Sequence, residues 1–546
     1  MSMVSEAVNI VYRFVTSVCD ANQKEIVEEN LKCLALIDKF TNNEKQHGLC
    51  TSYIETQKFL SRLNEKESIR KAKGVYYTPS DVVQFIVRSS INLLFGKLED
   101  DSIKALSSDD VDYKMFCMGK TTFDPTCGAG EFLLAVMDKK FELWEHNKGS
   151  SAKEDIEAIA GTIYGNDINP DSIVITKLRL YLCAVNRYGV EKCIDLPQIL
   201  NNNFSTQDYV VNPPSDRCGY DLVIGNPPYV EDVKSGLDLV ESYGNIYANV
   251  LVNVARRLNN NGVLGFVIPL SYVATPRMMK LRNELYSLVP EQYILSYSDR
   301  PDCLFTSVHQ KLCILLCRKN SVKRTIYTSD YRYWYKEERP HLFTDTSIVL
   351  NEYVKDDYVP KLGTYIDVAV YQKVTNGAKI QSIKSLSLRT GEPLFINMRA
   401  AFWIKAFRNP HPGAEYKSFM FESSDMANYL MCIVNSSLFW WYWTCVSDCW
   451  HITLKELVSF GVPKISDYSM TNHLAKEMEK KLEETKVYVG TKQTEYEYKH
   501  RSCVDVIHAI DNYINSIYGL TPEESEYIKS FAYQYRVSGG TINERN

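Results

Sequence analysis

Residues Thr121-Thr-Phe-Asp-Pro-Thr-Cys-Gly-Ala-Gly-Glu-Phe-Leu-Leu134 have the pattern of a buried strand, a tight glycine turn and the start of a helix. Asp124 ends the predicted strand, where open α/β sheets bind their ligands. Thr126 lies in the turn, and Gly128 and Gly130 let a ligand approach the backbone at a helix N-terminus that carries partial positive charge. The spacing differs from the dinucleotide fingerprint, and a carboxylate here would repel a pyrophosphate. The stretch therefore predicts a pocket for a cationic ligand that carries an amino acid, such as S-adenosylmethionine.

A second acidic residue follows the next predicted strand, Ile163–Gly165. Asp167 could accept hydrogen bonds from both ribose hydroxyls of such a ligand, and Ile168 could pack on its adenine. The alternative is structural, because Asp167 could also cap the helix that starts at Pro170. The glycine turn that precedes it favours the ribose.

The segment Ile199-Leu-Asn-Asn-Asn-Phe204 is predicted to form the edge of a third strand. There Asn203 would hydrogen-bond the adenine amine and Phe204 would cover the ring. The alternative is an asparagine-rich turn with no part in binding.

The tetrapeptide Asn226-Pro-Pro-Tyr229 follows the apolar run Asp221-Leu-Val-Ile-Gly225, which predicts a buried strand that ends in a rigid polar corner. Two consecutive prolines remove two backbone donors and fix φ. An amide side chain, a bare carbonyl and an aromatic face therefore meet at the strand end. Such a corner can accept two hydrogen bonds from a planar amino group and stack on the ring that carries it. It predicts chemistry on an exocyclic or amide nitrogen.

Apolar strands alternate with helical patterns over residues 71–322, which predicts a mostly parallel sheet with crossover helices. Residues 1–70 are predicted to be helical because their apolar residues recur at spacings of three and four. Residues 323–465 are irregular with short strand-like runs, and residues 466–546 are again helical in pattern. The predicted strands are Thr121–Phe123, Ile163–Gly165, Leu222–Ile224, Val263–Ile268 and Cys313–Cys317.

The 546 residues are 45% hydrophobic with a formal net charge of −5, which is typical of a folded protein of several domains. No apolar run approaches the roughly 20 residues of a membrane helix, and the N-terminus has no signal-peptide pattern. The cysteines form no Cys-x-x-Cys pair, so we expect apolar thiols and no metal site. The net charge neither supports nor excludes nucleic acid, since a basic cleft can lie on an acidic protein.

Four motifs together resemble the adenine-N6 DNA methyltransferases of restriction-modification systems: Gly74–Pro79, Asp124–Gly130, Asp167 and Asn226–Tyr229. Their order, with a large variable region last, is similar to the gamma arrangement of that family. The resemblance covers residues 71–322 and extends loosely to 420–540.

The resemblance implies an α/β fold class. A Rossmann-like methyltransferase domain with a mostly parallel sheet would span residues 71–322, after a helical N-terminal extension over 1–70. A mixed α+β target-recognition domain would span 323–465, and its C-terminal helical part 466–546.

The reaction that the resemblance implies moves a methyl group from S-adenosylmethionine to the N6 of a flipped-out adenine. Asn226 and the Pro227 carbonyl would accept the two amino hydrogens. Pro228 completes the rigid corner, and Tyr229 would stack on the base. The residue patterns and the resemblance together predict these cofactor contacts: Tyr77, Thr78, Pro79, Asp124, Thr126, Gly128, Gly130, Asp167, Ile168, Asn203, Phe204 and Asn226.

Phe305, in Cys303-Leu-Phe-Thr-Ser-Val-His-Gln-Lys311, falls where the family places an aromatic ring that stacks on the flipped base. A buried core phenylalanine is the alternative. Two positions depart from the family pattern: Asn203 replaces a third-strand carboxylate, and Asn245 stands where aspartate is more common.

Arg399, Lys405, Arg408 and His411 surround Phe402-Trp403, and this mixture of cations and aromatic rings indicates a DNA-facing surface. A solvated loop is the alternative.

Arg389 and Lys455 are further candidates for contacts with the DNA backbone. The aromatic run Leu438-Phe-Trp-Trp-Tyr-Trp443 is instead predicted to be packing core.

The implied partner is double-stranded DNA, and a separate restriction endonuclease is a second partner that the resemblance allows. The implied location is the cytoplasm of a prokaryote, or of a cell infected by the phage that encodes the protein, as a monomer or a dimer. We expect no fused nuclease, because the acidic residues of 1–70 lie in helical patterns. Two rival functions stay open: N-methylation of a protein glutamine or an RNA guanine, and a non-catalytic DNA-binding subunit.

Overall fold

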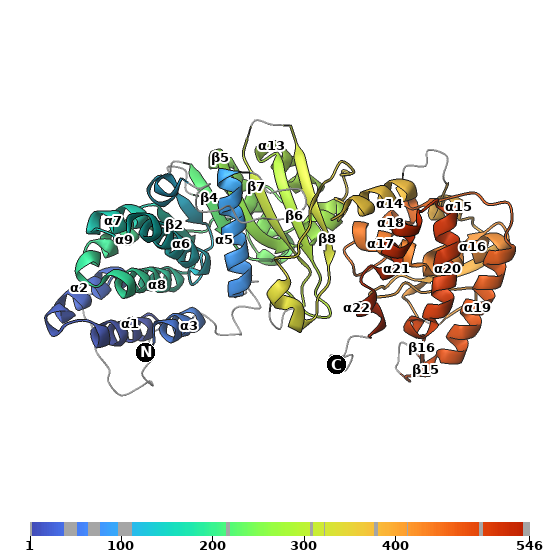
Figure 1. Cartoon of the computed structure of the whole chain (residues 1–546), viewed down its shortest axis with the longest axis horizontal. Helices are drawn as coiled ribbons and strands as arrows, with labels where there is room; N and C mark the ends of the chain where they lie inside the picture. The colour runs from blue at the N-terminus through green and yellow to red at the C-terminus, as the bar shows by residue number, and fades with distance from the viewer. Residues whose placement is uncertain are drawn as a thin grey trace. The chain divides into compact units, whose positions relative to one another are not determined.

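The computed structural model describes residues 3–37, 52–63, 77–96, 112–213, 219–305, 309–320, 323–375, 381–411, 413–490 and 495–538 (Figure 1). The chain divides into two compact units. The first unit comprises Met1–Tyr272, Arg277–Ile294 and Leu304–Tyr327, and the second comprises Val273–Pro276, Leu295–Cys303 and Thr328–Asn546. Within the described ranges, every helix is too short or too polar to cross a lipid bilayer.

A nine-stranded sheet carries the first unit, and its strands lie in the order β3-β2-β1-β4-β5-β7-β6-β8-β9. The first five of these strands are parallel to their neighbours, whereas β7 is antiparallel to β5. The last crossing of the chain from the first unit to the second lies within β8, between Tyr327 and Thr328. The bounds are β1 Thr122–Asp124, β2 Ile163–Asp167, β3 Phe204–Thr206, β4 Tyr220–Gly225, β5 Leu258–Pro269, β6 Glu291–Tyr297, β7 Leu312–Arg318, β8 Thr325–Arg332 and β9 Val349–Leu350.

The α/β fold class and the five predicted strands are confirmed, because each apolar run lies in a strand that is buried along most of its length. Strand β6 was not predicted. The third-strand prediction over Ile199–Phe204 is wrong for its first five residues, since helix α9 (Leu196–Asn203) takes them and only Phe204 begins β3. Pro197 lies in the first turn of α9, where its missing N–H costs nothing.

Helices cover the sheet of the first unit. Helix α5 (Ser80–Phe95) precedes β1 in the sequence, yet it packs against β4, β5 and β7 in the middle of the sheet (Figure 1). Helix α6 packs against β1 and β2, and α8 packs against β2 and β3. The remaining bounds are α6 Glu131–Lys148, α7 Lys153–Ala160, α8 Pro170–Tyr188, α10 Asp232–Ser235, α11 Ile246–Arg256, α12 Ser271–Ala274 and α13 Met279–Leu288.

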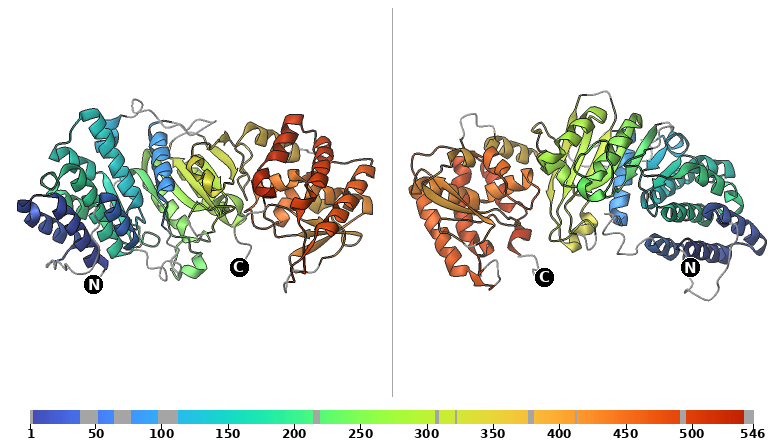
Figure 2. Two further views of the ribbon diagram at one scale, coloured as in Figure 1. Left: turned by 60° about the horizontal axis from the view of Figure 1, so that its bottom comes forward. Right: turned by 180° about the vertical axis from the view of Figure 1, so that it is seen from behind.

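The N-terminal segment forms helices α1 (Met3–Val18), α2 (Lys24–Ala35) and α3 (Tyr53–Leu63), as its apolar spacing predicted. α1 and α3 pack on α8, and α2 packs on α8 and α9, so this segment belongs to the first unit (Figure 2).

The second unit mixes helices with short strands. Its aromatic helix α17 buries the whole run Leu438–Trp443, which confirms the prediction that this run is packing core. The helices are α14 Tyr365–Thr375, α15 Ile383–Leu386, α16 Ser424–Asn435, α17 Ser437–Val446, α18 Leu454–Ser459, α19 Ser469–Thr485, α20 Val504–Ile517, α21 Pro522–Ser530 and α22 Tyr533–Val537. The strands are β10 Gln381–Ser382, β11 Glu392–Asn397, β12 Ala406–Phe407, β13 Tyr416–Phe421, β14 Gly461–Val462, β15 Val487–Tyr488 and β16 Tyr496–Glu497.

Candidate active site at the carboxyl edge of the sheet

Asp124 and Asn226 lie at the carboxyl ends of two neighbouring parallel strands, β1 and β4. Strands β2 and β3 follow on one side of β1, and β5 follows on the other side of β4. The boundary between β1 and β4 is therefore the topological switch point, where open α/β sheets bind ligands. The two strand ends approach closely because Gly225 has no side chain. A Cβ at Gly225 would stand 2.7 Å from Asp124 Oδ1.

The glycine turn after β1 depends on left-handed backbone, with φ of +54° at Gly128 and +82° at Gly130. Gly130 is also required by space, since a Cβ there would lie 2.6 Å from Thr176 Cγ2. The Thr176 hydroxyl donates to the Gly128 carbonyl oxygen over 2.9 Å. The turn is therefore a fixed cradle at the N-terminus of α6.

Asp124 is a buried carboxylate at the base of this cradle, and its Oδ1 accepts a hydrogen bond from the Thr126 backbone N–H over 3.0 Å. Burial raises the pKa of Asp124 well above its usual value. The Thr126 hydrogen bond opposes this shift, and the nearby Asp167 charge reinforces it. A cation bound beside Asp124 would stabilise its ionised form.

Asp167 joins two segments of the same edge. Its Oδ2 accepts from the Gly128 N–H over 2.9 Å, and its Oδ1 accepts from the Asn169 N–H over 2.8 Å. The cap of α8 is Asn169, whose Oδ1 accepts from Asp171 N, so the capping role considered for Asp167 belongs to another residue. Ile168 beside it is 61% exposed, as a residue that packs on a ligand ring would be in the free protein.

Asn203 does not join this site. Its Nδ2 donates to the carbonyl oxygens of Ala160, Gly161 and Ile163, over 3.3, 3.3 and 3.0 Å. These carbonyls lie at the start of β2, whereas the site lies at the end of that strand. The expected contact between Asn203 and an adenine amine is therefore corrected. Its neighbour Phe204 packs over β2, with Cε1 2.4 Å from where a Cβ at Gly165 would lie.

Asn166 was not singled out in the sequence, yet it connects three strand ends. Its Nδ2 donates to the carbonyl oxygens of Pro125 and Gln207, both over 3.0 Å. Its Oδ1 accepts from the Ser205 hydroxyl, and its own carbonyl oxygen accepts from Cys127 N. Its position directly before Asp167 was visible, but its four partners are not local in the sequence.

The corner Asn226–Tyr229 is held in one orientation by hydrogen bonds. Asn226 Nδ2 donates to Thr78 Oγ1 over 3.0 Å. The Tyr229 hydroxyl lies 2.5 Å from Asn226 Oδ1 and 2.7 Å from the Val267 carbonyl oxygen. The amide oxygen therefore points into the corner, on the side opposite Thr78.

Thr78 is buried at the entry of α5, and Tyr77 before it is 40% exposed. Pro79 occupies the N-cap position of α5, without a side-chain hydrogen bond to the helix. The first part of the predicted cofactor motif, Gly74–Tyr76, lies outside the described residues.

Phe305 has its side chain almost completely covered, at 1% exposure. A base could stack on this ring only after a rearrangement of its surroundings. Asn245 caps α11, with its Oδ1 accepting from Tyr247 N over 3.4 Å, which accounts for an amide at that position.

Arg179 holds the glycine turn through hydrogen bonds from its guanidinium group. Its Nη1 donates to the Ala129 carbonyl oxygen over 2.6 Å and to Glu131 Oε1 over 2.7 Å. Its Nε donates to Gln57 Oε1 over 2.9 Å, and Gln57 Nε2 donates back to the Arg179 carbonyl oxygen over 3.0 Å. This buried chain of hydrogen bonds connects helix α3 of the N-terminal segment to the turn between Gly128 and Gly130.

In the second unit, Arg408 is not the DNA-facing residue that its surroundings in the sequence suggested. Its guanidinium donates to Glu392 Oε2, to Asn428 Oδ1 and to the Ser424 carbonyl oxygen, over 2.8, 2.9 and 3.0 Å. Its backbone N–H donates to Glu479 over 2.7 Å. Arg408 therefore connects elements of the unit, and the prediction is corrected.

The neighbouring candidates Trp403, His411 and Lys455 also contact other residues of the second unit. The Arg536 guanidinium carbon lies 4.1 Å from the centre of the Trp403 ring, and the His411 ring packs on Phe407 in a tilted arrangement with 3.9 Å between the ring centres. Lys455 donates to two carbonyl oxygens, those of Ala274 and Val446, so it too is internal.

Three of the basic candidates keep some access to solvent. Arg399 and Arg389 are exposed, and Lys405 is half-buried. Their side chains are therefore not fully enclosed by the second unit.

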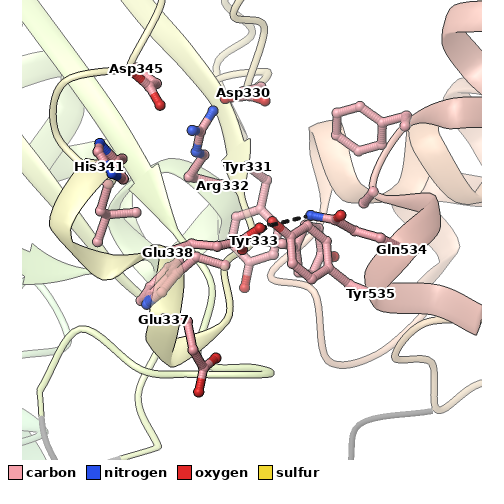
Figure 3. Close-up of a pocket in the computed structure, with 14 residues that line it drawn as sticks. Asp330, Tyr331, Arg332, Tyr333, Glu337, Glu338, His341, Asp345, Gln534 and Tyr535 are labelled. Atoms are coloured by element: carbon pink, nitrogen blue, oxygen red, sulfur yellow. Dashed lines mark hydrogen bonds between the residues drawn. The ribbon is translucent and has the colours of Figure 1, made fainter. Parts of the chain in front are cut away.

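A cavity of about 520 Å³ lies in the second unit beside β8 and α22 (Figure 3). Carboxylates are prominent in its lining, and burial raises the pKa of Asp330 to about 6. Gln534 Nε2 donates to Glu338 Oε1 over 3.0 Å across it. Because none of the predicted site residues lines this cavity and its acidic wall would repel phosphate, it is separate from the candidate site.

Comparison with known proteins finds a family match in the segment that builds this site. Residues 161–299 match the family model of the Eco57I restriction-modification methylase. This segment contains Asp167 and Asn226–Tyr229, so two of the four motifs lie in the part of the chain that is similar to this methylase family.

Among curated proteins, the adenine-specific methyltransferase PglX of Streptomyces coelicolor is 24% identical over 200 residues, which are 30% of this chain and 15% of that protein. The type II methyltransferase M.VspI of a Vibrio species is 23% identical over 283 residues, 48% of this chain and 56% of that protein. The chain thus matches little more than half of the length of M.VspI and much less of PglX.

Among solved structures, the type IIL restriction-modification enzyme MmeI in complex with DNA has a TM-score of 0.52 at 13% identity. The match covers 95% of this chain and 84% of MmeI, so the two share a fold that extends through both compact units.

Proposed function

We propose that the chain is an adenine-N6-specific DNA methyltransferase that uses S-adenosylmethionine. The observation that carries the proposal is the juxtaposition of Asp124 and Asn226 at the switch point, where a cation site and an amide oxygen meet. The first unit would bind the cofactor and perform the reaction, and the second would contact the DNA.

The residues present fit the cofactor. Asp124 offers a buried carboxylate to a cationic amino-acid end, and the turn of Gly128 and Gly130 offers open backbone at a helix N-terminus. Asp167 already orders this turn, and a carboxylate has lone pairs left to accept ribose hydroxyls. Bound there, S-adenosylmethionine supplies a methyl group activated by its sulfonium charge.

Asn226 and Pro227 would do the work on the substrate nitrogen. The N6 of adenine is a poor nucleophile because its lone pair is delocalised into the ring. Acceptance of its two hydrogens by Asn226 Oδ1 and the Pro227 carbonyl would pull the nitrogen toward tetrahedral geometry and build electron density on it. Positioning of this kind can lower the activation barrier by about 7–11 kcal/mol.

The substrate base would have to leave the DNA helix, because N6 is inaccessible to this corner within a duplex. Stacking on Tyr229 would offset part of the unpairing cost of a few kcal/mol. Phe305 would contribute only if the base displaces what now covers it. Double-stranded DNA is then the proposed partner, and the cytoplasm of a prokaryote is the proposed location.

Long-read sequencing of DNA from cells that express the protein tests the proposal. We expect N6-methyladenine in one sequence context, and its absence with an Asn226→Ala variant that still binds the cofactor. Modified cytosine, or unmodified DNA beside a methylated protein or RNA, would refute it in favour of a rival acceptor nitrogen. A variant that methylates at the normal rate would refute the role of Asn226.

A further inference from the structure

Trp450 is the most exposed of the described tryptophans, with 37% of its side chain accessible, and it lies between two arginines of the second unit. The guanidinium carbon of Arg300 is 5.6 Å from the centre of its ring, and that of Arg399 is 5.3 Å away. Both arginines are exposed. We call Arg300, Trp450 and Arg399 the arginine–tryptophan cluster.

The backbone fixes the position of Trp450 beside Arg399. The carbonyl oxygen of Trp450 accepts from Ala400 N over 3.3 Å, and Ile452 N donates to the Met398 carbonyl oxygen over 2.7 Å. Asp448 Oδ1 accepts from the Trp450 N–H over 3.0 Å. The indole is therefore presented at the surface by an ordered turn.

Arg300 is held in a similar way from a different segment. Ser298 Oγ donates to the Arg300 carbonyl oxygen over 2.8 Å and accepts from the Arg300 N–H over 3.2 Å. The cluster is thus assembled from three separate stretches of the second unit, and no short sequence motif contains it.

The cluster carries two positive charges that are not neutralised internally. Neither Arg300 nor Arg399 forms an ion pair with a described residue of the chain, and Asp448 uses its Oδ1 on backbone N–H groups. Cation–π contact stabilises each arginine by only about 0.5–1 kcal/mol at an exposed site. Both guanidiniums contact the same exposed indole, so the arrangement offers two cations to an anionic partner within one small area.

We propose that the arginine–tryptophan cluster is a DNA contact of the second unit, with the two guanidiniums on backbone phosphates and the indole against an exposed sugar or base. This inference rests on the proposed action on DNA. Guanidinium groups bind phosphate by paired hydrogen bonds, and an aromatic ring beside them can pack on a sugar of the duplex or stack on a base that has left the helix. The cluster includes Arg399, a predicted DNA contact, and adds Arg300 and Trp450.

The test measures the affinity of the full chain for a fluorescent mixed-sequence DNA duplex at several salt concentrations. Each lost phosphate contact lowers the salt dependence by about 0.9 in logarithmic slope. The wild-type affinity should therefore fall about 12-fold more than that of the Arg300→Gln, Arg399→Gln double variant between 50 and 200 mM salt. Trp450→Ala should weaken binding about fivefold or more with an unchanged slope, and Trp450→Phe should restore most of it.

Arg501→Gln and Tyr365→Ala are matched controls, since both change an exposed side chain of the second unit outside the cluster. They should bind like the wild type. A double variant that binds DNA with the wild-type slope refutes the cluster and leaves the proposed function intact. If the wild type does not bind the duplex even at low salt, both the cluster and the proposed function fail.

Discussion

Asp124 is the residue at which stability and ligand binding make opposite demands. Burial raises its pKa, so the folded state keeps the proton to higher pH than the unfolded chain, in which aspartate titrates near pH 3.9. The unfolding free energy therefore falls as the pH rises from about 4 through the raised pKa of Asp124. Above that pKa the folded protein keeps the whole penalty of a buried ionised carboxylate. The charge that destabilises the free protein is the one that would attract a cationic ligand.

Asp124→Asn should consequently raise the melting temperature of the ligand-free protein at pH 7 and leave it nearly unchanged near pH 3. The same variant should bind the cofactor at least about tenfold more weakly, since one lost ion pair of 1.4 kcal/mol corresponds to that factor. Thermal melts over a pH series and calorimetric titration measure the two effects. A variant that is less stable than wild type at pH 7 would contradict the assignment of the burial cost to Asp124.

Thr78 controls which atom of Asn226 faces a substrate. The Thr78 hydroxyl accepts from Nδ2, which leaves Oδ1 to point into the corner. Thr78→Val removes that acceptor, and the amide can then turn its NH₂ toward the incoming amino group. We expect kcat to fall on the order of fivefold, the value of one hydrogen bond of about 1 kcal/mol.

Thr78→Ser is the control for this change, because serine keeps the hydroxyl and should keep kcat near the wild-type value. Single-turnover methylation assays distinguish the two variants. Equal rates for Val and Ser would show that the hydroxyl does not orient the amide.

At the residue scale, the sequence was enough to place contiguous motifs in the fold, and it was not enough where a side chain has distant partners. The corner Asn226–Tyr229 and the turn after Asp124 are contiguous stretches, and the structure brings them together at one edge. Arg408 stood among cations and aromatic rings, but its partners include Glu479, 71 residues away in the sequence. No local pattern contains that information.

At the scale of helices and strands, the sequence again predicted what a local pattern encodes and missed what depends on distant partners. Strands with continuous apolar runs were predicted because both faces of a parallel sheet are covered. Strand β6, with the sequence Glu291-Gln-Tyr-Ile-Leu-Ser-Tyr297, was missed because it begins with charged and polar residues, although every position in it is buried. Glu291 is neutralised by Arg318 of β7, 2.7 Å away, which the sequence could not reveal.

Helix α3 has a predicted role that follows from its position. Gln57 orients Arg179, and Arg179 holds the carbonyl of Ala129 inside the glycine turn. Gln57→Leu leaves the Arg179 Nε buried without its partner, so we expect the turn to loosen and the Kd for S-adenosylhomocysteine to rise about fivefold.

Lys58→Ala, an exposed change on the same helix, should leave this Kd unaltered. Calorimetric titration of both variants checks the expectation. If Gln57→Leu binds the ligand like Lys58→Ala, the N-terminal helices do not support the turn.

At the scale of the whole molecule, two compact units predict two unfolding steps. The residues of the proposed cofactor site all lie in the first unit. S-adenosylhomocysteine at about 100 times its Kd should add about 2.7 kcal/mol to the unfolding free energy of that unit alone. Differential scanning calorimetry should show one transition that moves with ligand and one that does not. A single transition that moves as a whole would contradict independent units.

The Tyr229 hydroxyl has one proton and two acceptors within reach, Asn226 Oδ1 and the Val267 carbonyl. In the empty corner the proton can satisfy the amide oxygen, and on arrival of an amino group it can rotate to Val267 without displacement of any heavy atom. Asn226 Oδ1 would then accept from the amino group in place of the Tyr229 hydroxyl, and it would have a hydrogen-bond donor at every stage. Hypoxanthine presents an oxygen where adenine presents its amine, so it offers no replacement donor. A deaminated base would set its oxygen against the Pro227 carbonyl and, once the proton has rotated away, against Asn226 Oδ1 as well, so both acceptors would disfavour it.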